Sequence, residues 1–273
     1  MKSLLLSGVA GRLGVTVTLV GLLSLMTVVH ASLDVAPTRI TLADGERAAS
    51  VMVVNRSDEV QTFRVVVADT EEFEEGGRRL LSEPGEGGHH AAAMLRHSPR
   101  QATLQPGERQ VVRLQARRPA ELAEGEYRAR LAVQTLPRAR PPRADSGGGT
   151  EGGIELDIQV LFAVTLPVAI FQGSPEARTT IAGARVTDEG LMVELERQGR
   201  RSSYGRLVLY AGDRAEGSSL ARLERAVVVV PLERRVFRFR DVEIEPGSQL
   251  HVVYEGIGER AGEIKAVRTV VVE

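Results

Sequence analysis

The sequence predicts an all-β protein built from two β-sandwich domains, and three features of its 273 residues lead to this class. Short segments rich in Val, Ile and Thr recur at intervals of roughly 8–12 residues, which is typical of an antiparallel sandwich. No segment keeps a 3.6-residue apolar period over the length of a helix. Turn dipeptides that end in glycine separate the segments; they are Asp44-Gly45, Pro84-Gly85, Pro106-Gly107 and Pro246-Gly247.

The amino-terminal residues 1–31 are predicted to be a signal peptide. Lys2 and Arg12 are the only charged residues in this segment, and the apolar run Leu13–Val29 follows them. Small residues at the −3 and −1 positions favour cleavage after Ala31. The run is slightly shorter than the roughly 18–20 residues that span a bilayer, so an uncleaved anchor is the alternative. Both interpretations place the rest of the chain outside the cytoplasm.

The first domain is predicted over residues 32–167, and its strands are short and rich in β-branched side chains. Two regions interrupt the pattern. Residues 71–97 are charged and rich in Gly, and we expect a long connection with little regular structure. Residues 137–153 are rich in Pro, Arg and Gly, and we expect a loop. The predicted strands are Ser50–Asn55, Thr62–Ala68, Gln110–Ala116 and Tyr127–Thr135.

The second domain is predicted over residues 168–273. We place the boundary near 167–175, where Pro167 and an irregular segment follow a strand. Two sandwiches of about 130 and 100 residues are within the usual range of domain sizes. The strands expected in the second domain are Thr180–Thr187, Leu191–Arg197, Gly205–Ala211, Ala221–Val230, Arg235–Ile244, Gln249–Tyr254 and Ile264–Val272.

Composition excludes several classes of function. The 35 Lys and Arg against 36 Asp and Glu leave no basic excess for a general electrostatic contact with nucleic acid. The absence of Cys excludes thiolate metal sites, a thiol nucleophile and disulfides. A hydrophobic fraction of 42% is sufficient for packed cores without such links.

The segment at residues 154–165 has the pattern with the clearest functional meaning. Its even positions are all apolar, and a period of two places them on one face of a strand. They are Ile154, Leu156, Ile158, Val160, Phe162 and Val164. The odd positions are charged or polar in the first half. An ordinary half-buried edge strand fits this pattern. The alternative is that Ile154, Leu156, Ile158 and Val160 project from an open edge and fill a groove in a partner, which adds its own strand there.

At this point the order of motifs resembles the periplasmic pilus and fimbrial assembly chaperones, the PapD-like family. The match is strong in the first domain and weaker in the second. The matching segments, in the family's order, are Val35–Ile40, Val53–Asp58, the Pro-Gly turn and strand within Ser98–Leu114, Glu124–Arg128, and Leu166–Val168.

The resemblance implies two immunoglobulin-like domains set at an angle. It also implies a periplasmic chaperone that donates a strand to unfinished pilus or fimbrial subunits and delivers them to an outer-membrane usher. The donor strand would be about residues 154–165. No enzyme activity, nucleotide, metal, nucleic acid or small-molecule substrate is expected.

In the family, a cleft arginine beside a threonine and a lysine at the end of the donor strand bind the carboxylate at the end of the subunit. Arg39, preceded by Thr38, matches the arginine, whereas Thr165 stands where the family has lysine. Either Arg39 acts with the hydroxyls of Thr38 and Thr165, or binding depends more on the strand, or the client differs.

Other functions have weaker support. His89, His90 and His97 lack the ligand spacing of a metal site. No Gly-x-Ser-x-Gly motif supports nucleophilic catalysis, and 4% aromatic residues with no Trp disfavour carbohydrate binding. The arginines of Arg234–Arg240 are expected to form a solvated stripe or a surface for partner docking. The alternative function is that of an exported structural or adhesive protein with the chaperone fold and no donor activity.

Overall fold

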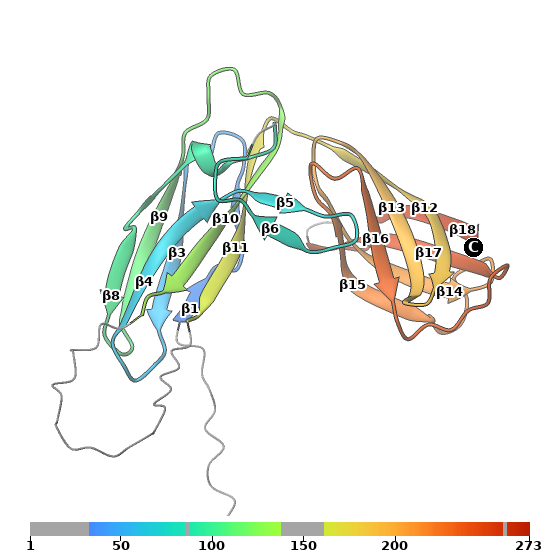
Figure 1. Cartoon of the computed structure of the whole chain (residues 1–273). Helices are drawn as coiled ribbons and strands as arrows, with labels where there is room; N and C mark the ends of the chain where they lie inside the picture. The colour runs from blue at the N-terminus through green and yellow to red at the C-terminus, as the bar shows by residue number, and fades with distance from the viewer. Residues whose placement is uncertain (1–32, 86–87, 138–160, 259–260) are drawn as a thin grey trace, which may run out of the picture.

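The computed structural model describes residues 33–85, 88–137, 161–258 and 261–273. These residues form two β-sandwiches that meet at an angle (Figure 1), and the predicted all-β class is confirmed. The signal segment and most of the predicted donor strand, including Ile154, Leu156, Ile158 and Val160, lie outside the described residues. Within the described ranges, no helix has the length and apolar character to cross a membrane.

The first sandwich consists of two sheets, ordered β1-β3-β9-β7 and β2-β11-β10-β4-β8. Apolar side chains from alternate positions of both sheets form its core, with Phe63, Leu131 and Ile170 completely buried. Its strands are β1 (Leu33–Ala36), β2 (Ile40–Leu42), β3 (Ala48–Asn55), β4 (Gln61–Ala68), β7 (Leu95–Ser98), β8 (Gln101–Leu104), β9 (Arg109–Ala116), β10 (Gly125–Thr135) and β11 (Ala163–Gln172).

The second sandwich packs sheet β12-β13-β16 against sheet β15-β14-β17-β18. Its separate core includes Leu195, Leu209 and Tyr254, all fully buried. All seven strands predicted for this domain are present, with ends that differ by a few residues. They are β12 (Ala177–Thr187), β13 (Gly190–Gly199), β14 (Ser203–Ala211), β15 (Ala221–Val228), β16 (Arg234–Phe239), β17 (Gln249–Gly256) and β18 (Ile264–Val271).

The chain passes between the sandwiches at residues 173–176, so a division after Pro167 is too early. Strand β11 continues to Gln172, and Val168 and Ile170 belong to the first core. Proline suggested an end to the strand because it lacks a backbone N–H. Here β2 pairs only with Val168–Ile170, so Pro167 lies at an open edge where no neighbour needs that donor.

Residues 71–97 contain more regular structure than we expected. Strands β5 (Thr70–Glu72) and β6 (Arg78–Leu80) form a hairpin that reaches toward the second sandwich (Figure 1), and the 3₁₀ turn η1 (Ala92–Met94) precedes β7. The strands of the hairpin carry opposite charges, Glu71 and Glu72 against Arg79 and Arg78. The two strands of the hairpin are stabilised by charge pairs rather than by a buried apolar face. Their sequence therefore lacks the alternation of apolar residues that would indicate a strand.

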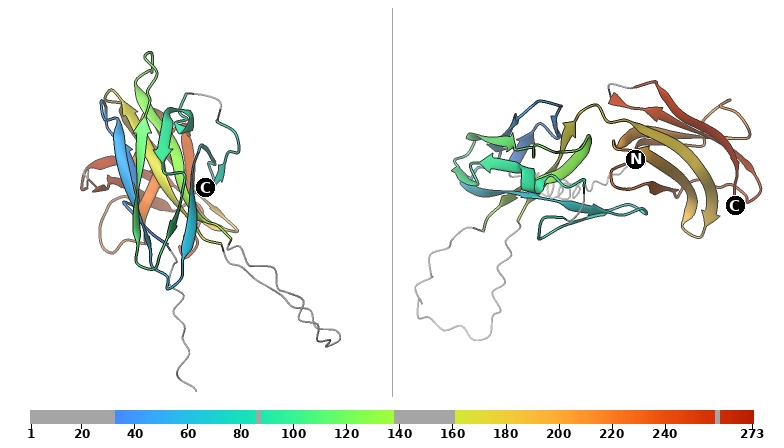
Figure 2. Two further views of the ribbon diagram at one scale, coloured as in Figure 1. Left: turned by 90° about the vertical axis from the view of Figure 1, so that its left-hand side faces the viewer. Right: turned by 90° about the horizontal axis from the view of Figure 1, so that it is seen from above.

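The hairpin also connects the two domains. Strand β16 is the edge of its sheet, and the N–H of Val236 donates to the carbonyl of Glu74 at the tip of the hairpin, with an N–O distance of 2.9 Å. The view from above shows the hairpin extending across the space between the sandwiches (Figure 2). Glu72 and Arg78 of the hairpin line a cavity between the two sandwiches.

Candidate functional site

One face of the sheet β2-β11-β10 points toward the second sandwich. On β11, Leu166, Val168 and Ile170 are buried in the core, so Thr165 and Pro167 project from the opposite face. Pro167 pairs with Arg130 on β10, and Val168 pairs with Ile40 on β2. Arg39 precedes Ile40 and therefore reaches the same level as Pro167 from the other side.

These side chains line a cavity of about 460 Å³ between the domains. It contains Thr38, Arg39 and Thr165, so the structure brings together the three residues that the resemblance suggests as a carboxylate anchor. Six arginines and a single carboxylate, Glu72, carry the charge of its lining. The lining residues are Thr38, Arg39, Glu72, Arg78, Arg128, Arg130, Thr165, Pro167, Tyr204, Arg225, Val227, Val229 and Arg235.

Arg39 stacks on an aromatic ring. Its guanidinium carbon lies 4.5 Å from the centre of the Tyr204 ring, which is a cation–π contact. Within the described residues it makes no ion pair, and its side chain is half-buried. Thr38 and Thr165 are exposed beside it. A planar guanidinium in this position can bind a carboxylate through two parallel hydrogen bonds.

A buried network, which we call the interdomain lock, connects Glu126 and Arg128 on β10 with Ser202 and Tyr204 of the second sandwich. The Glu126 carboxylate is fully buried and accepts hydrogen bonds from the Ser202 backbone N–H (2.7 Å), the Ser202 hydroxyl (2.8 Å) and Arg128 Nη1 (2.8 Å). Arg128 also donates to the Tyr204 hydroxyl at 2.8 Å. Burial opposes the charge of Arg128, but Tyr204 and Glu126 outweigh it and raise its pKa. The lock therefore fixes the aromatic ring on which Arg39 rests.

Arg130 has the opposite environment, although it is only two residues from Arg128. Burial, and then the positive charge of Arg78, lower the pKa of Arg130 to about 10, and Glu72 offsets this only in part. Arg78 Nε lies 3.7 Å from Glu72 Oε2. Burial also lowers the pKa of Arg235, whose Nη1 donates to the carbonyl of Val227. This side of the cavity has more positive charge than its own groups neutralise.

A second cavity, of about 470 Å³, adjoins the first and shares Arg39, Tyr204 and Arg225 with it. Its walls include the apolar side chains of Ala169 and Phe171. The arginine-lined cleft thus continues into a less polar space on the other side of Arg39.

An open strand edge begins beside the cleft. Since β2 covers only Val168–Ile170, the edge of β11 from Ala163 to Pro167 has no neighbour on that side among the described residues. Ahead of β11, Leu161 and Phe162 are 54% and 37% exposed. The backbone of Phe162 still exchanges hydrogen bonds with Thr135 on the opposite side, so the strand direction is maintained up to that residue.

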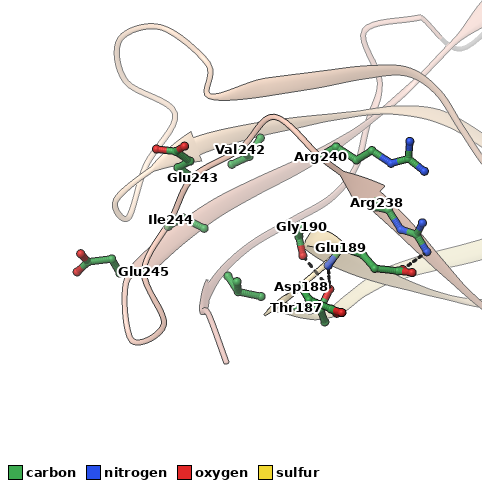
Figure 3. A pocket seen from close by; sticks show the side chains of 11 residues that line it. Thr187, Asp188, Glu189, Gly190, Arg238, Arg240, Val242, Glu243, Ile244 and Glu245 are labelled. Atoms are coloured by element: carbon green, nitrogen blue, oxygen red, sulfur yellow. Dashed lines mark hydrogen bonds and ion pairs between the residues drawn. The ribbon is translucent and has the colours of Figure 1, made fainter.

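Other clusters fit a binding site less well. A larger cavity, about 890 Å³, lies in the second domain, and Glu189 forms an ion pair with Arg238 in its lining (Figure 3). It contains none of the sequence-predicted site residues. Arg234 likewise pairs with Glu194 at 3.1 Å, so much of the Arg234–Arg240 stripe is neutralised within its own domain.

Two of the histidines contact backbone carbonyls. His89 Nδ1 lies 3.0 Å from the carbonyl of Glu126, and His97 Nε2 lies 3.1 Å from that of Val65. In the described part of the chain, no three His, Cys, Asp or Glu side chains gather as a metal site would require.

Several cleft residues were not identified from the sequence. The alternation of Arg128 and Arg130 with buried Ala129 and Leu131 is visible in the sequence and places both arginines on an outer face. What it does not show is that the second domain covers this face. Arg78 and Glu72 were missed because the hairpin that carries them was expected to be an irregular loop.

Comparison with known proteins supports the fold. No family model matches the chain, and no curated protein matches its sequence. Among solved structures, it is similar to a chain of a chaperone–tip adhesin complex of CFA/I fimbriae biogenesis, with a TM-score of 0.53, 11% identity and coverage of 88% of this chain and 99% of the other. It is also similar to the YadV chaperone, with a TM-score of 0.53, 10% identity and coverage of 88% of this chain and 100% of the other. A third similar structure is a chain of the CsuC–CsuE chaperone–tip adhesion subunit complex from Acinetobacter baumannii. Here the TM-score is 0.52, the identity is 13%, and the match covers 89% of this chain and 100% of the other.

The resemblance to pilus chaperones is thereby confirmed at the level of the fold. These neighbours are chaperones or chains of chaperone–subunit complexes.

Proposed function

We propose that this protein is a periplasmic chaperone that binds unfinished pilus or fimbrial subunits by donating a strand, and that it delivers them to an outer-membrane usher. The observation that carries the proposal is the position of the open edge of β11. In chain order this edge ends with Thr165 and Pro167, which also line the arginine-rich cavity. An anion site and a strand edge are therefore adjacent, as binding of an extended chain end requires.

In this proposal Arg39 pairs with the carboxylate at the carboxyl terminus of the client, and the hydroxyls of Thr38 and Thr165 add hydrogen bonds. The client strand then lies along β11 and runs toward the cleft. The carboxyl end of the client strand lies at the cleft, and the open edge of β11 also runs toward the cleft and ends there at Pro167. The two strands are therefore parallel. Backbone hydrogen bonds along the open edge supply affinity, and alternate side chains supply specificity.

The apolar residues Ile154, Leu156, Ile158 and Val160 continue the same strand direction in the sequence. We propose that they fill the groove in the client's incomplete sandwich. Covering this edge would also protect both proteins from edge-to-edge aggregation.

Co-expression with a cognate subunit tests strand donation. The wild-type protein should yield a soluble one-to-one complex, and Ile158→Asp should abolish it, because a charge would enter the client's apolar groove. Gln159→Asp is the matched control, since residue 159 falls on the other face of the strand and capture should persist. If Ile158→Asp captures the subunit at full yield, the protein is not a strand donor, and the structural or adhesive alternative gains support.

The anchor needs a separate test, Arg39→Ala. Weaker capture by this variant, with unchanged folding, is the expected result. Unchanged capture would remove Arg39 from the binding site and leave strand donation intact.

A further inference from the structure

The cleft contains more positive charge than one chain-end carboxylate would neutralise. Among the described residues, six guanidinium groups line it, and only that of Arg128 has a fully buried carboxylate partner within hydrogen-bonding distance. Glu72 is the single carboxylate of the lining. A partner that presents one negative charge to Arg39 would leave the opposite side of the cavity with an excess.

This excess lies apart from Arg39. Arg39 precedes β2 and Arg130 lies on β10, with β11 between them. Neighbouring strands are about 4.8 Å apart, so the two backbones are separated by about 10 Å. Arg39 rests on Tyr204, whereas the charges that act on Arg130 include Arg78 and Glu72 of the hairpin. The cavity therefore has two arginine groups on different walls.

Two buried atoms at the hairpin side have no hydrogen-bond partner among the described residues. One is Oε1 of Glu72, whose side chain is only 6% exposed, and the other is Nε of Arg235. A buried polar atom is costly unless it is paired. Here one atom is an acceptor and the other a donor, and both belong to side chains that line the same cavity. Both atoms are shielded from solvent, so a ligand would contact the other polar atoms of these two side chains, which line the cavity.

We propose that Arg78, Arg130, Arg235 and Glu72 form a second anion subsite, which binds the side-chain carboxylate of an acidic residue at the last or next-to-last position of the client. The arginines bind the carboxylate, and Glu72 stays beside Arg78, with Oε2 3.7 Å from Arg78 Nε. This inference rests on the proposed function, since it takes the chain end of a bound client to lie in the cleft. It assigns the client a chemical feature: an acidic residue beside its terminal carboxylate.

Short acetylated dipeptides test the subsite without a known client. The probes are acetyl-Glu-Ala and acetyl-Ala-Glu, compared with acetyl-Gln-Ala and acetyl-Ala-Gln, and each pair differs by one side-chain charge. Their affinity for the full-length mature protein is measured by NMR titration at low salt. For at least one pair, the Glu peptide should bind about 5–10-fold more tightly than its Gln counterpart, in the range of a single charged contact.

Variants then locate this preference. Arg130→Gln and Arg78→Gln should each bring the ratio of affinities close to one, whereas Arg113→Gln should preserve it. Arg113 is exposed on β9 in the other sheet and provides the same change in charge. Folding of each variant is verified from its amide spectrum.

The outcomes separate this inference from the proposed function. If the Gln peptides bind but neither Glu peptide is preferred, or if the preference survives in Arg130→Gln, the second subsite is wrong and the anchor at Arg39 stands. If no peptide binds the cleft, both the subsite and the anchor are overturned. Failure of the strand-donation proposal would appear in a different experiment, as full capture of the subunit by Ile158→Asp.

Discussion

Arg128 and Arg130 lie two residues apart on one face of β10, yet the protein uses them in opposite ways. Arg128 is enclosed by Glu126, Ser202 and Tyr204, which stabilise its charge. Arg130 is half-buried next to Arg78, and its charge is disfavoured. The first arginine belongs to the interdomain lock and the second to the open cleft. Pairing therefore distinguishes the two arginines: the charge of Arg128 is paired within the molecule, and Arg130 is the one that the proposed subsite would use.

This division of roles has a physical reason. A carboxylate anchor must hold its position before the ligand arrives, because ordering long side chains on binding reduces affinity. The lock provides that order by fixing Tyr204 against Arg128, and Tyr204 in turn supports Arg39. The cleft keeps its charges unneutralised, at a cost in stability that a bound anion would recover.

The largest effect is expected from breaking the lock with Glu126→Ala. This change leaves the Arg128 charge buried without its carboxylate and the Ser202 N–H without its acceptor, so the free energy of unfolding should fall by about 3–5 kcal/mol. Urea denaturation measures the loss. Glu121→Ala, on an exposed turn, should change stability by less than about 0.5 kcal/mol. Equal effects of the two variants would show that the network does not hold the domains together.

Ser202→Ala should have an intermediate effect. The Ser202 hydroxyl donates to Glu126 at 2.8 Å and accepts from the Val230 N–H at 3.1 Å. Without it the Val230 donor remains buried and unpaired, which should cost about 1–3 kcal/mol. The same urea titration applies, with the exposed Ser218→Ala as control. A loss no greater than that of the control would contradict the assignment of Ser202 to the lock.

Arg130→Gln should leave stability nearly unchanged or raise it slightly. Its charge is disfavoured in the folded state, but solvent still reaches part of the side chain and screens the effect, so a gain of only about a few tenths of a kcal/mol is expected. The comparison with Arg128→Gln is direct, because that change should destabilise the fold. A large loss of stability for Arg130→Gln would place Arg130 in the structural network instead.

The smallest effect is a pH dependence that distinguishes wild type from Arg130→Gln. The pKa of Arg130 is lowered to about 10 in the folded protein, so above pH 10 the unfolded chain binds more protons there than the folded one. The wild type should therefore gain stability relative to the variant as the pH rises through 10. Burial raises the pKa of Tyr254 to about 12, which lowers stability between about pH 10 and 12, but equally in both proteins. A constant difference across this range would contradict the altered pKa of Arg130.

The sequence was sufficient for the architecture and for part of the site. Short segments rich in β-branched residues predicted the seven strands of the second domain and four of the first, and the family resemblance grouped Arg39 with Thr38 and Thr165, which the fold brings to one cavity. Arg78 and Glu72 were not predicted, because the β5–β6 hairpin depends on charge pairs and on contact with β16 rather than on a local apolar pattern. Contacts between domains leave no periodic signal in a sequence.

The boundary at Pro167 shows a related limit. Proline ordinarily argues against a strand, and only the sheet order shows that Pro167 lies beyond the end of β2, at an edge where the missing N–H costs little. The same open edge is the feature on which the proposed function depends.

Cysteine cross-linking between β11 and a bound client tests the central claim most directly. The natural chain has no Cys, so Ala163→Cys introduces a single thiol on the open edge. A cognate subunit carries one cysteine at each of its last five positions in turn. Since a disulfide requires Cα atoms within about 7 Å, the account predicts a cross-link between Ala163→Cys and one or two of these positions, and none with Glu243→Cys in the second-domain cavity. A stable complex that cross-links equally at both sites, or never at Ala163→Cys, would contradict binding of the client's end along β11.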